Sequence, residues 1–260
     1  ADEIENIVYD YFYKMVIPET PTLYDYLILS LRKKDIIASF NWDPLLLQSY
    51  KRSIKIKRLP QLAFLHGNVG TGVCYECKRY GYIDTLCEGC MKPFSPMKLL
   101  YPVKHKNYSA DSLIKEQWVN LRYKLKHAYI FTIFGYSAPV TDIDARNLMF
   151  EEWKSNPSLP IVEMEIIDIK KREEIERTWQ GFIYSHHYGV HKSIHHSFLW
   201  RYPRRSCDAF AAANLMCNPW KDNTFQDFKT IEELHNWIKP LLKEEDRYEQ
   251  SKEPFEYMVK

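Results

Sequence analysis

Four cysteines stand in the spacing of a metal site. Cys74 and Cys77 form one C-x2-C pair, and Cys87 and Cys90 form a second pair farther along the chain. Each pair can turn two thiolates toward one ion, and two pairs complete the closed tetrahedral sphere that structural zinc prefers. A closed sphere leaves no position for a reactive water. We therefore expect zinc to hold together a compact ribbon over residues 71–93 and to do no chemistry.

Two disulfides are the alternative for these four thiols, and they would require an oxidising compartment. The rest of the sequence suggests none. The acidic, tyrosine-rich start is unlike a signal peptide, and the longest apolar runs are too short to cross a bilayer. The sequence thus favours zinc, a cytoplasmic location and no membrane partner. Cys207 and Cys217 lie outside the pattern, and we expect both to be small buried apolar side chains.

A second set of residues with chemical potential follows short apolar runs. The runs span residues 35–41, 61–66, 129–135 and 161–168, and the side chains of interest at or after their ends are Asn41, Asp43, His66, Gly135, Ser137 and Asp168. Runs of this length, separated by helical patterns, indicate buried strands of a parallel sheet. We predict an α/β fold with a doubly wound, Rossmann-like parallel sheet. Ligands bind at the carboxyl ends of such strands, so these residues should gather at one edge.

Length and charge restrict the possibilities less. The chain has 260 residues, 45% of them hydrophobic, and its net charge of +2 gives no reason to expect nucleic acid as a partner. We predict a main domain over residues 1–170 that carries the inserted ribbon. Residues 171–260 should form a mixed, mainly helical C-terminal extension, with helices near 205–217 and 230–245.

Taken in order, the motifs resemble a known family. Ser39-Phe-Asn-Trp-Asp43, Leu65-His66-Gly67 ahead of the cysteines, and Gly135-Tyr-Ser137 are similar to motifs of the sirtuin superfamily. The closer resemblance is to its divergent bacterial sirtuin-like branch, which includes NAD-cleaving proteins. Each motif is weak alone, but their order together with the cysteine ribbon is specific, and the resemblance covers roughly residues 35–170.

The resemblance implies catalytic roles for three residues. His66 would be the general base, taking a proton from a ribose hydroxyl of NAD or, indirectly, from an attacking water. An imidazole suits this role because it titrates near neutral pH. Asn41 would orient the ribose or the water, and Asp43 would bind the nicotinamide carboxamide.

The resemblance also implies an NAD-binding set. Phe40 stands where the family has a glutamine that contacts the ribose. Gly135 and Ser137 would lie under the ribose and phosphates, where a missing side chain permits close approach. Asp168 stands where an acidic or amide side chain could hold the adenosine ribose. The cofactors implied are therefore NAD, as substrate or ligand, and structural zinc.

Plainer interpretations stay open for these residues. A histidine at a strand end is often only a hydrogen-bonded cap, and Asn41 with Asp43 could form an Asx turn before a helix at Pro44. The histidine-rich segment 186–196 has no accompanying cysteine or carboxylate pattern, so we expect a surface or packing role there.

Two departures from the family bear on function. No glycine-rich loop and no apolar strand precede Asp35, although such a strand should be central to the sheet. A missing N-terminal segment or a homo-oligomer partner could supply it. Residues 99–105 also lack the Phe-Gly-Glu strand that pairs with acyl-lysine peptides in deacylating sirtuins. We expect hydrolysis of NAD to nicotinamide and ADP-ribose, with a protein deacylase and a catalytically silent nucleotide-sensing or interaction module as alternatives.

Overall fold

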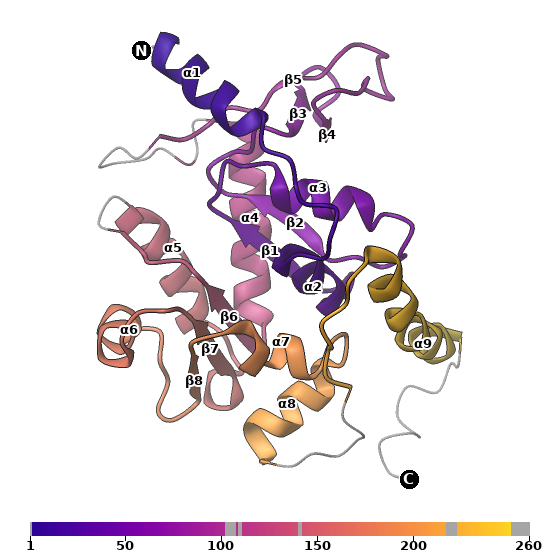
Figure 1. Cartoon of the computed structure of the whole chain (residues 1–260). Coiled ribbons are helices and arrows are strands. Elements are labelled where there is room, and N and C mark those ends of the chain that lie inside the picture. The colour runs from indigo at the N-terminus through magenta and orange to yellow at the C-terminus, as the bar shows by residue number, and fades with distance from the viewer. Residues whose placement is uncertain (1, 102–107, 109–110, 140–141, 217–222, 251–260) are drawn as a thin grey trace.

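The structure is a computed structural model that describes residues 2–101, 108, 111–139, 142–216 and 223–250 (Figure 1). Its helices are α1 (Asp2–Tyr13), α2 (Leu23–Ser30), α3 (Leu45–Arg52), α4 (Ser112–His127), α5 (Ile143–Lys154), α6 (Arg172–Trp179), α7 (Phe198–Arg201), α8 (Ser206–Leu215) and α9 (Ile231–Gln250). Its strands are β1 (Ile36–Ser39), β2 (Gln61–Phe64), β3 (Thr71–Cys74), β4 (Arg79–Tyr82), β5 (Ser95–Pro96), β6 (Ile130–Phe134), β7 (Glu163–Ile167) and β8 (Tyr188–His191).

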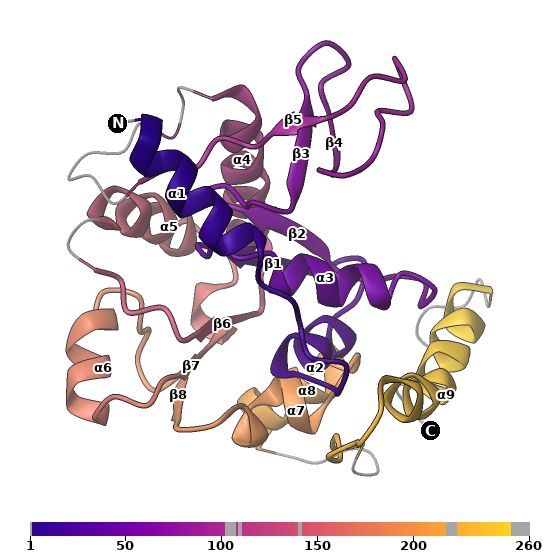
Figure 2. The same cartoon turned by 45° about the horizontal axis from the view of Figure 1, so that its top comes forward.

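The strands form three separate sheets, each of which we call a ladder. β1 pairs in parallel with β2, and β7 pairs in parallel with both β6 and β8, whereas β3 pairs antiparallel with β4 and β5. A strand lies within each of the four apolar runs and is slightly shorter than the run; β7 is buried throughout, whereas β1, β2 and β6 are only partly buried. The antiparallel ladder is the cysteine ribbon, which projects from the rest of the molecule (Figure 2). The expected α/β fold with parallel strands and an inserted ribbon is confirmed.

Helices cover both faces of the parallel strands. Side chains along β2 alternate between two apolar cores: Leu65, just beyond β2, packs with α4 and α5, whereas Phe64 packs with α2, α3 and α9. β7 does the same, with Ile166 in the first core and Ile167 in the second. Successive side chains of a strand point to opposite faces, so burial on both faces explains the near-continuous apolar runs. This is the doubly wound arrangement that the sequence predicts.

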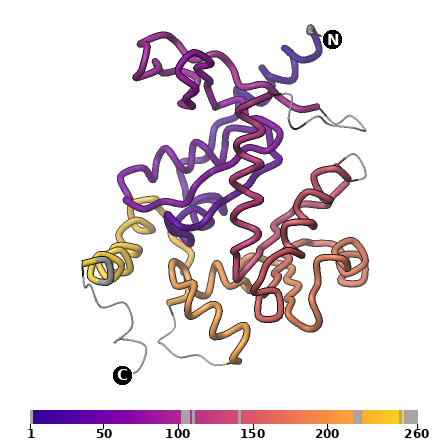
Figure 3. The backbone as a smooth tube through the Cα atoms, turned by 180° about the vertical axis from the view of Figure 1, so that it is seen from behind, coloured from indigo at the N-terminus to yellow at the C-terminus, as the bar shows by residue number. Residues whose placement is uncertain are grey.

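Helix α4 joins the two parallel ladders on one face. It packs against β1, β2 and α5, and Figure 3 shows it running from the ribbon end of the molecule toward β6. Asp111 begins the helix, because its side chain accepts hydrogen bonds from the backbone N–H groups of Leu113 and Ile114. The inward face of α4 is apolar and buried, and this packing holds the helix against β1 and β2.

The two parallel ladders end at β1 and β6, and these two strands do not pair with each other among the described residues. The backbone carbonyls of Asp35 and Ser39 accept hydrogen bonds from the β2 side, so the polar groups of Ile36 and Ala38 point away from β2. Tyr129 and Gly135 make backbone hydrogen bonds with the β7 side. Because alternate residues of a strand direct their backbone groups to opposite sides, the backbone groups of Thr132 point away from β7. β1 and β6 thus end their ladders with unpaired backbone groups.

The C-terminal region contributes helices α6–α9 and also strand β8, which the sequence patterns do not predict. β8 extends the ladder of β6 and β7. Leu234 and Ile238 of α9 are fully buried and attach this helix to α2 and α3. In the described parts of the chain, no helix combines the length and apolarity needed to span a bilayer.

Candidate functional site

The four ribbon cysteines come together as the spacing predicts. Their sulfur atoms all lie within 4.8 Å of one another, and the Cys74 and Cys90 sulfurs are 3.6 Å apart. A tetrahedron with Zn–S bonds of about 2.3 Å places its sulfurs about 3.8 Å apart, whereas a disulfide requires about 2.05 Å. The thiols are unpaired and fit one zinc ion. The zinc prediction is therefore supported by geometry, and a closed sphere gives the ion a structural role.

The backbone of the ribbon is shaped around this cluster. Lys78 and Met91, the residues that follow each C-x2-C pair, both have left-handed backbones, with φ of 52° and 59°. The backbone therefore turns in the same way after each cysteine pair. Between them, a β-carbon on Gly89 would lie only 2.9 Å from the Cys77 sulfur, so this position requires glycine.

His66 follows β2 and lies in the interior, with 6% of its surface exposed. The chain turns directly after it at Gly67, whose φ is +84° and where a β-carbon would be 2.2 Å from the Lys98 carbonyl oxygen. A turn at this position requires glycine for both reasons. The residues that leave the ribbon therefore press against the turn that positions His66.

Three parallel strand ends meet at His66. The ring of Phe40, which follows β1, lies 4.8 Å from the His66 ring in an edge-on contact. Phe40 also stacks on Tyr136, which follows β6, with ring centres 4.2 Å apart and planes 8° from parallel. Tyr108 lies on the remaining side, its hydroxyl 3.3 Å from His66 Nε2. The structure thus brings Phe40 and His66 together and adds two tyrosines to them.

Asp142 is a neighbour of His66 that is not among the site residues predicted from the sequence. Its Oδ1 lies 3.9 Å from His66 Nε2, and its Oδ2 accepts a hydrogen bond of 3.2 Å from the Tyr136 hydroxyl. It is 6% exposed. One signal could have identified it, since a carboxylate at the start of the helix after β6 lies at the ligand-binding edge of a parallel sheet.

Burial keeps the two site phenols protonated. It raises the pKa of Tyr108 and Tyr136 far above the ordinary tyrosine value, and the negative charge of Asp142 raises both further. At neutral pH both hydroxyls therefore carry their protons. The Tyr136 hydroxyl consequently acts as the donor toward Asp142, and the carboxylate as the acceptor.

Asn41 and Asp43 contact a different set of groups. The exposed Asn41 side chain amide lies 3.5 Å from the Tyr24 hydroxyl. Asp43 Oδ1 accepts a hydrogen bond of 3.1 Å from the Leu45 backbone N–H at the start of α3. Burial raises the pKa of the Asp43 carboxyl. These contacts match the Asx-turn interpretation, and the catalytic roles of Asn41 and Asp43 stay predictions.

The remaining members of the predicted NAD set lie at strand ends. Gly135 has φ +63°, and the space beside its Cα is open, since a β-carbon would meet nothing within 4 Å. Ser137 is exposed. Asp168 is half-buried, and its Oδ1 accepts a hydrogen bond of 3.0 Å from the Lys170 backbone N–H. Their roles in binding NAD stay predictions.

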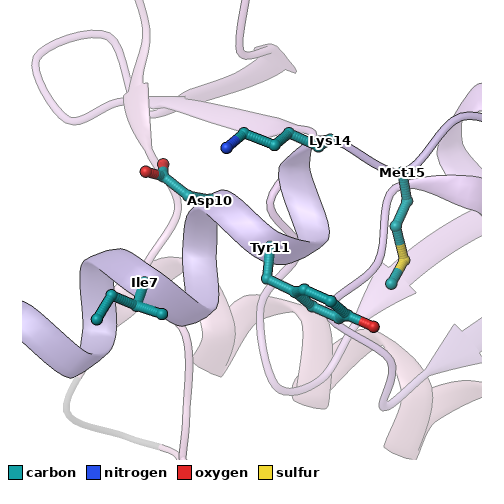
Figure 4. A pocket seen from close by; sticks show the side chains of 5 residues that line it. All are labelled: Ile7, Asp10, Tyr11, Lys14 and Met15. Carbon is teal, nitrogen blue, oxygen red and sulfur yellow. The ribbon is translucent and has the colours of Figure 1, made fainter.

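Two further expectations can be compared with the structure. Cys207 is exposed, so its expected burial is wrong; it lies on α8, where the side chain faces outward. Cys217 lies outside the described residues, as does most of segment 99–105. A pocket on the N-terminal helix is lined by Ile7, Asp10, Tyr11, Lys14 and Met15, none of them a predicted site residue (Figure 4).

Comparison with known proteins gives partial structural likenesses. No protein-family model and no curated protein matches the chain. A structure described as a SIR2 homolog–NAD complex is 12% identical with a TM-score of 0.40, over 73% of this chain and 67% of that chain. One on the structural basis for sirtuin substrate affinity is 14% identical with a TM-score of 0.37, over 65% and 70%. A Sir2–p53 peptide–NAD+ complex is 14% identical with a TM-score of 0.36, over 65% and 68%. All three carry names from the superfamily that the motifs resemble.

Proposed function

We propose that this protein binds NAD at the carboxyl ends of β1, β2 and β6 and hydrolyses it to nicotinamide and ADP-ribose. The observation that supports the proposal most is the burial of His66 where these three strand ends meet, against Phe40 and Tyr136. Parallel sheets bind ligands at this edge, and an imidazole is the side chain best suited to accept a proton at neutral pH.

The reaction divides its work among few groups. Departure of nicotinamide leaves an oxocarbenium ion at C1′ of the ribose, and a water adds to that carbon. His66 accepts the proton, directly or through a ribose hydroxyl, while Asn41 and Asp43 orient the water and the carboxamide. The aromatic rings around His66 enclose the site and would exclude competing nucleophiles. Zinc held by Cys74, Cys77, Cys87 and Cys90 would fix the fold of the ribbon and would take no part in the chemistry.

The open edges of β1 and β6 bear on how this site is completed. In the order 3-2-1-4-5-6 of doubly wound sheets, the first strand lies between the second and the fourth. The two parallel ladders, with orders β2-β1 and β6-β7-β8, would match the two sides of this order with its first strand left out. We propose that a parallel strand from polypeptide outside residues 1–260, or from a second copy, pairs with both edges and contributes to the phosphate site.

One observation favours a second candidate, a silent nucleotide-sensing or interaction module. The unpaired edges lie beside the predicted phosphate site, so a chain that never receives the extra strand would lack part of its dinucleotide contacts. A protein deacylase rests on the family resemblance alone, because residues 99–105 lack the Phe-Gly-Glu motif of deacylating sirtuins.

The proposal is tested by chromatography of NAD after incubation with this protein and with its His66→Ala variant. We expect the parent to release nicotinamide and ADP-ribose in equal amounts and the variant to lose at least a hundredfold in rate, because the base is gone. His127→Ala is the matched control, since His127 lies exposed on α4 and caps its own helix through the Tyr123 carbonyl. Equal release by the parent and His66→Ala would contradict the assignment.

A further inference from the structure

We propose that Asp142 is the positioning residue for His66: its carboxylate orients the imidazole and stabilises the imidazolium that forms when His66 accepts a proton. This inference deepens the proposed function and rests on His66 being its base. The residues that carry it are Tyr136, Asp142 and His66, which lie in contact in that order.

The first observation is that the Asp142 side chain does not cap its own helix. It occupies the N-cap position of α5, where an aspartate ordinarily accepts hydrogen bonds from the first backbone N–H groups of the helix. Its side chain makes no such bond. Asp111, in the same position at α4, accepts two of them, from Leu113 and Ile114. The carboxylate of Asp142 is instead turned toward His66 and Tyr136, at the expense of its own helix.

The second observation is the environment of the pair. Both His66 and Asp142 are only 6% exposed, and the atoms that face each other are 3.9 Å apart. Exposed ion pairs at this distance contribute little because water screens them, whereas a buried pair interacts in a lower effective dielectric. A negative charge at this distance favours the protonated imidazole over the neutral ring.

The other titratable groups around the pair do not cancel this effect. Tyr108 and Tyr136 stay neutral at working pH, because burial and the charge of Asp142 raise their pKa. Asp144 adds a second negative charge near Tyr108, and Arg146 adds a positive one near Tyr136. Asp142 contributes the carboxylate oxygen that lies 3.9 Å from His66 Nε2.

Tyr136 fixes the direction of the carboxylate. Its hydroxyl donates to Asp142 Oδ2 at 3.2 Å, which leaves Oδ1 as the oxygen that faces His66. The Tyr136 ring is itself held by stacking on Phe40 at 4.2 Å. A Phe40–Tyr136 stack therefore orients Asp142, and Asp142 orients His66.

In the proposed reaction this arrangement supports one proton transfer. The C1′–N bond breaks with its electron pair leaving on nicotinamide, and the water oxygen forms the new C1′–O bond. The O–H bond of that water breaks as an N–H bond forms on His66, and the imidazolium charge pairs with Asp142. The proton then passes to solvent, so one NAD and one water give nicotinamide, ADP-ribose and a proton.

The first test reads His66 directly and needs no activity. The His66 imidazole C–H signal is titrated by NMR in the intact protein and in its Asp142→Asn variant. We expect the pKa of His66 to fall by about one unit, a tenfold loss of proton affinity, because the amide carries no charge. Asp111→Asn removes a carboxylate from the equivalent position of α4 and should leave His66 unchanged. A His66 titration that is the same in Asp142→Asn and in the parent would overturn the proposal.

The second test separates positioning from stability by kinetics. Asp142→Asn should lower kcat for nicotinamide release at least tenfold with little change in KM, and the acidic limb of its pH profile should move to lower pH. A loss of fold would instead appear in circular dichroism and would lower the apparent kcat only by reducing the folded fraction. An unchanged kcat with an intact fold overturns the proposal. If neither protein cleaves NAD, the proposed function fails, and the NMR titration still decides the role of Asp142.

Discussion

All four thiols of the zinc ribbon come from the stretch between Cys74 and Cys90, whereas the groups around His66 come from three strand ends and a helix start, spread from Phe40 to Asp142. A short loop costs little entropy to close, so two cysteine knuckles and one ion suffice to fix the ribbon. The His66 site exists only when the sheet, α4 and α5 are all in place. The ribbon thus depends on its metal ion, whereas the His66 site depends on the whole fold.

This difference explains what the sequence could predict. Cysteine spacing reports on metal binding directly, because all ligands are neighbours in the chain. β1, β2 and β7 are visible as apolar runs because each packs apolar side chains into cores on both of its faces, and strand order then places Phe40, His66 and Gly135 at one edge.

The rest could not be predicted for physical reasons. The contact of Asp142 with His66 could not be predicted, because the choice between capping α5 and facing His66 is made by tertiary contacts. β8 escaped detection because its side chains are half-buried and include Gly189, so neither an apolar run nor a clean alternation marks it. The unpaired edges of β1 and β6 depend on which strands are present, and the pattern of one strand carries no such information.

The largest expected effect separates the two regions by their dependence on metal. Freshly purified protein should contain about one equivalent of zinc, and a strong chelator should unfold the ribbon, because metal binding supplies its folding free energy. Hydrogen exchange should then accelerate over β3 and β4, while β6 and β7 stay protected. Cys90→Ser should lose the zinc, and Cys207→Ser, which alters an exposed thiol, should keep it. Less than about half an equivalent of zinc in the parent would contradict the four-thiolate site.

The next effect tests how much the close contact between the Gly67 turn and the Lys98 carbonyl limits substitution at Gly67. Gly67→Ala should destabilise the protein by about 2–4 kcal/mol, because it combines a left-handed backbone with a collision against the Lys98 carbonyl. Gly135→Ala is the matched control: its φ is also positive, but the added carbon meets open space, so about 1 kcal/mol is expected. Urea denaturation measures both. Equal losses in the two variants would show that the Lys98 contact is unimportant.

A smaller, pH-dependent effect tests whether a buried charge on Glu163 of β7 lowers the free energy of unfolding. Burial, and then the charge of Glu165, raises the pKa of Glu163 to about 7. Because its unfolded pKa is near 4.5, the protonated side chain favours folding below that value, and this contribution is lost as pH rises toward 7. Glu163→Gln should therefore stabilise the protein by roughly 2 kcal/mol at pH 8 and have little effect at pH 4. Denaturation at the two pH values measures this, and a gain of equal size at both would contradict it.

The most direct test of the central claim, that NAD binds at the strand ends around His66, is to titrate NAD into the protein while following the imidazole C–H signals of His66 and His127 by NMR. The His66 signal should shift and saturate, since the ligand would enter a buried aromatic site, and the signal of His127 on α4 should stay where it is. A His66 signal that does not move at millimolar NAD, or that moves only together with His127, would contradict the claim.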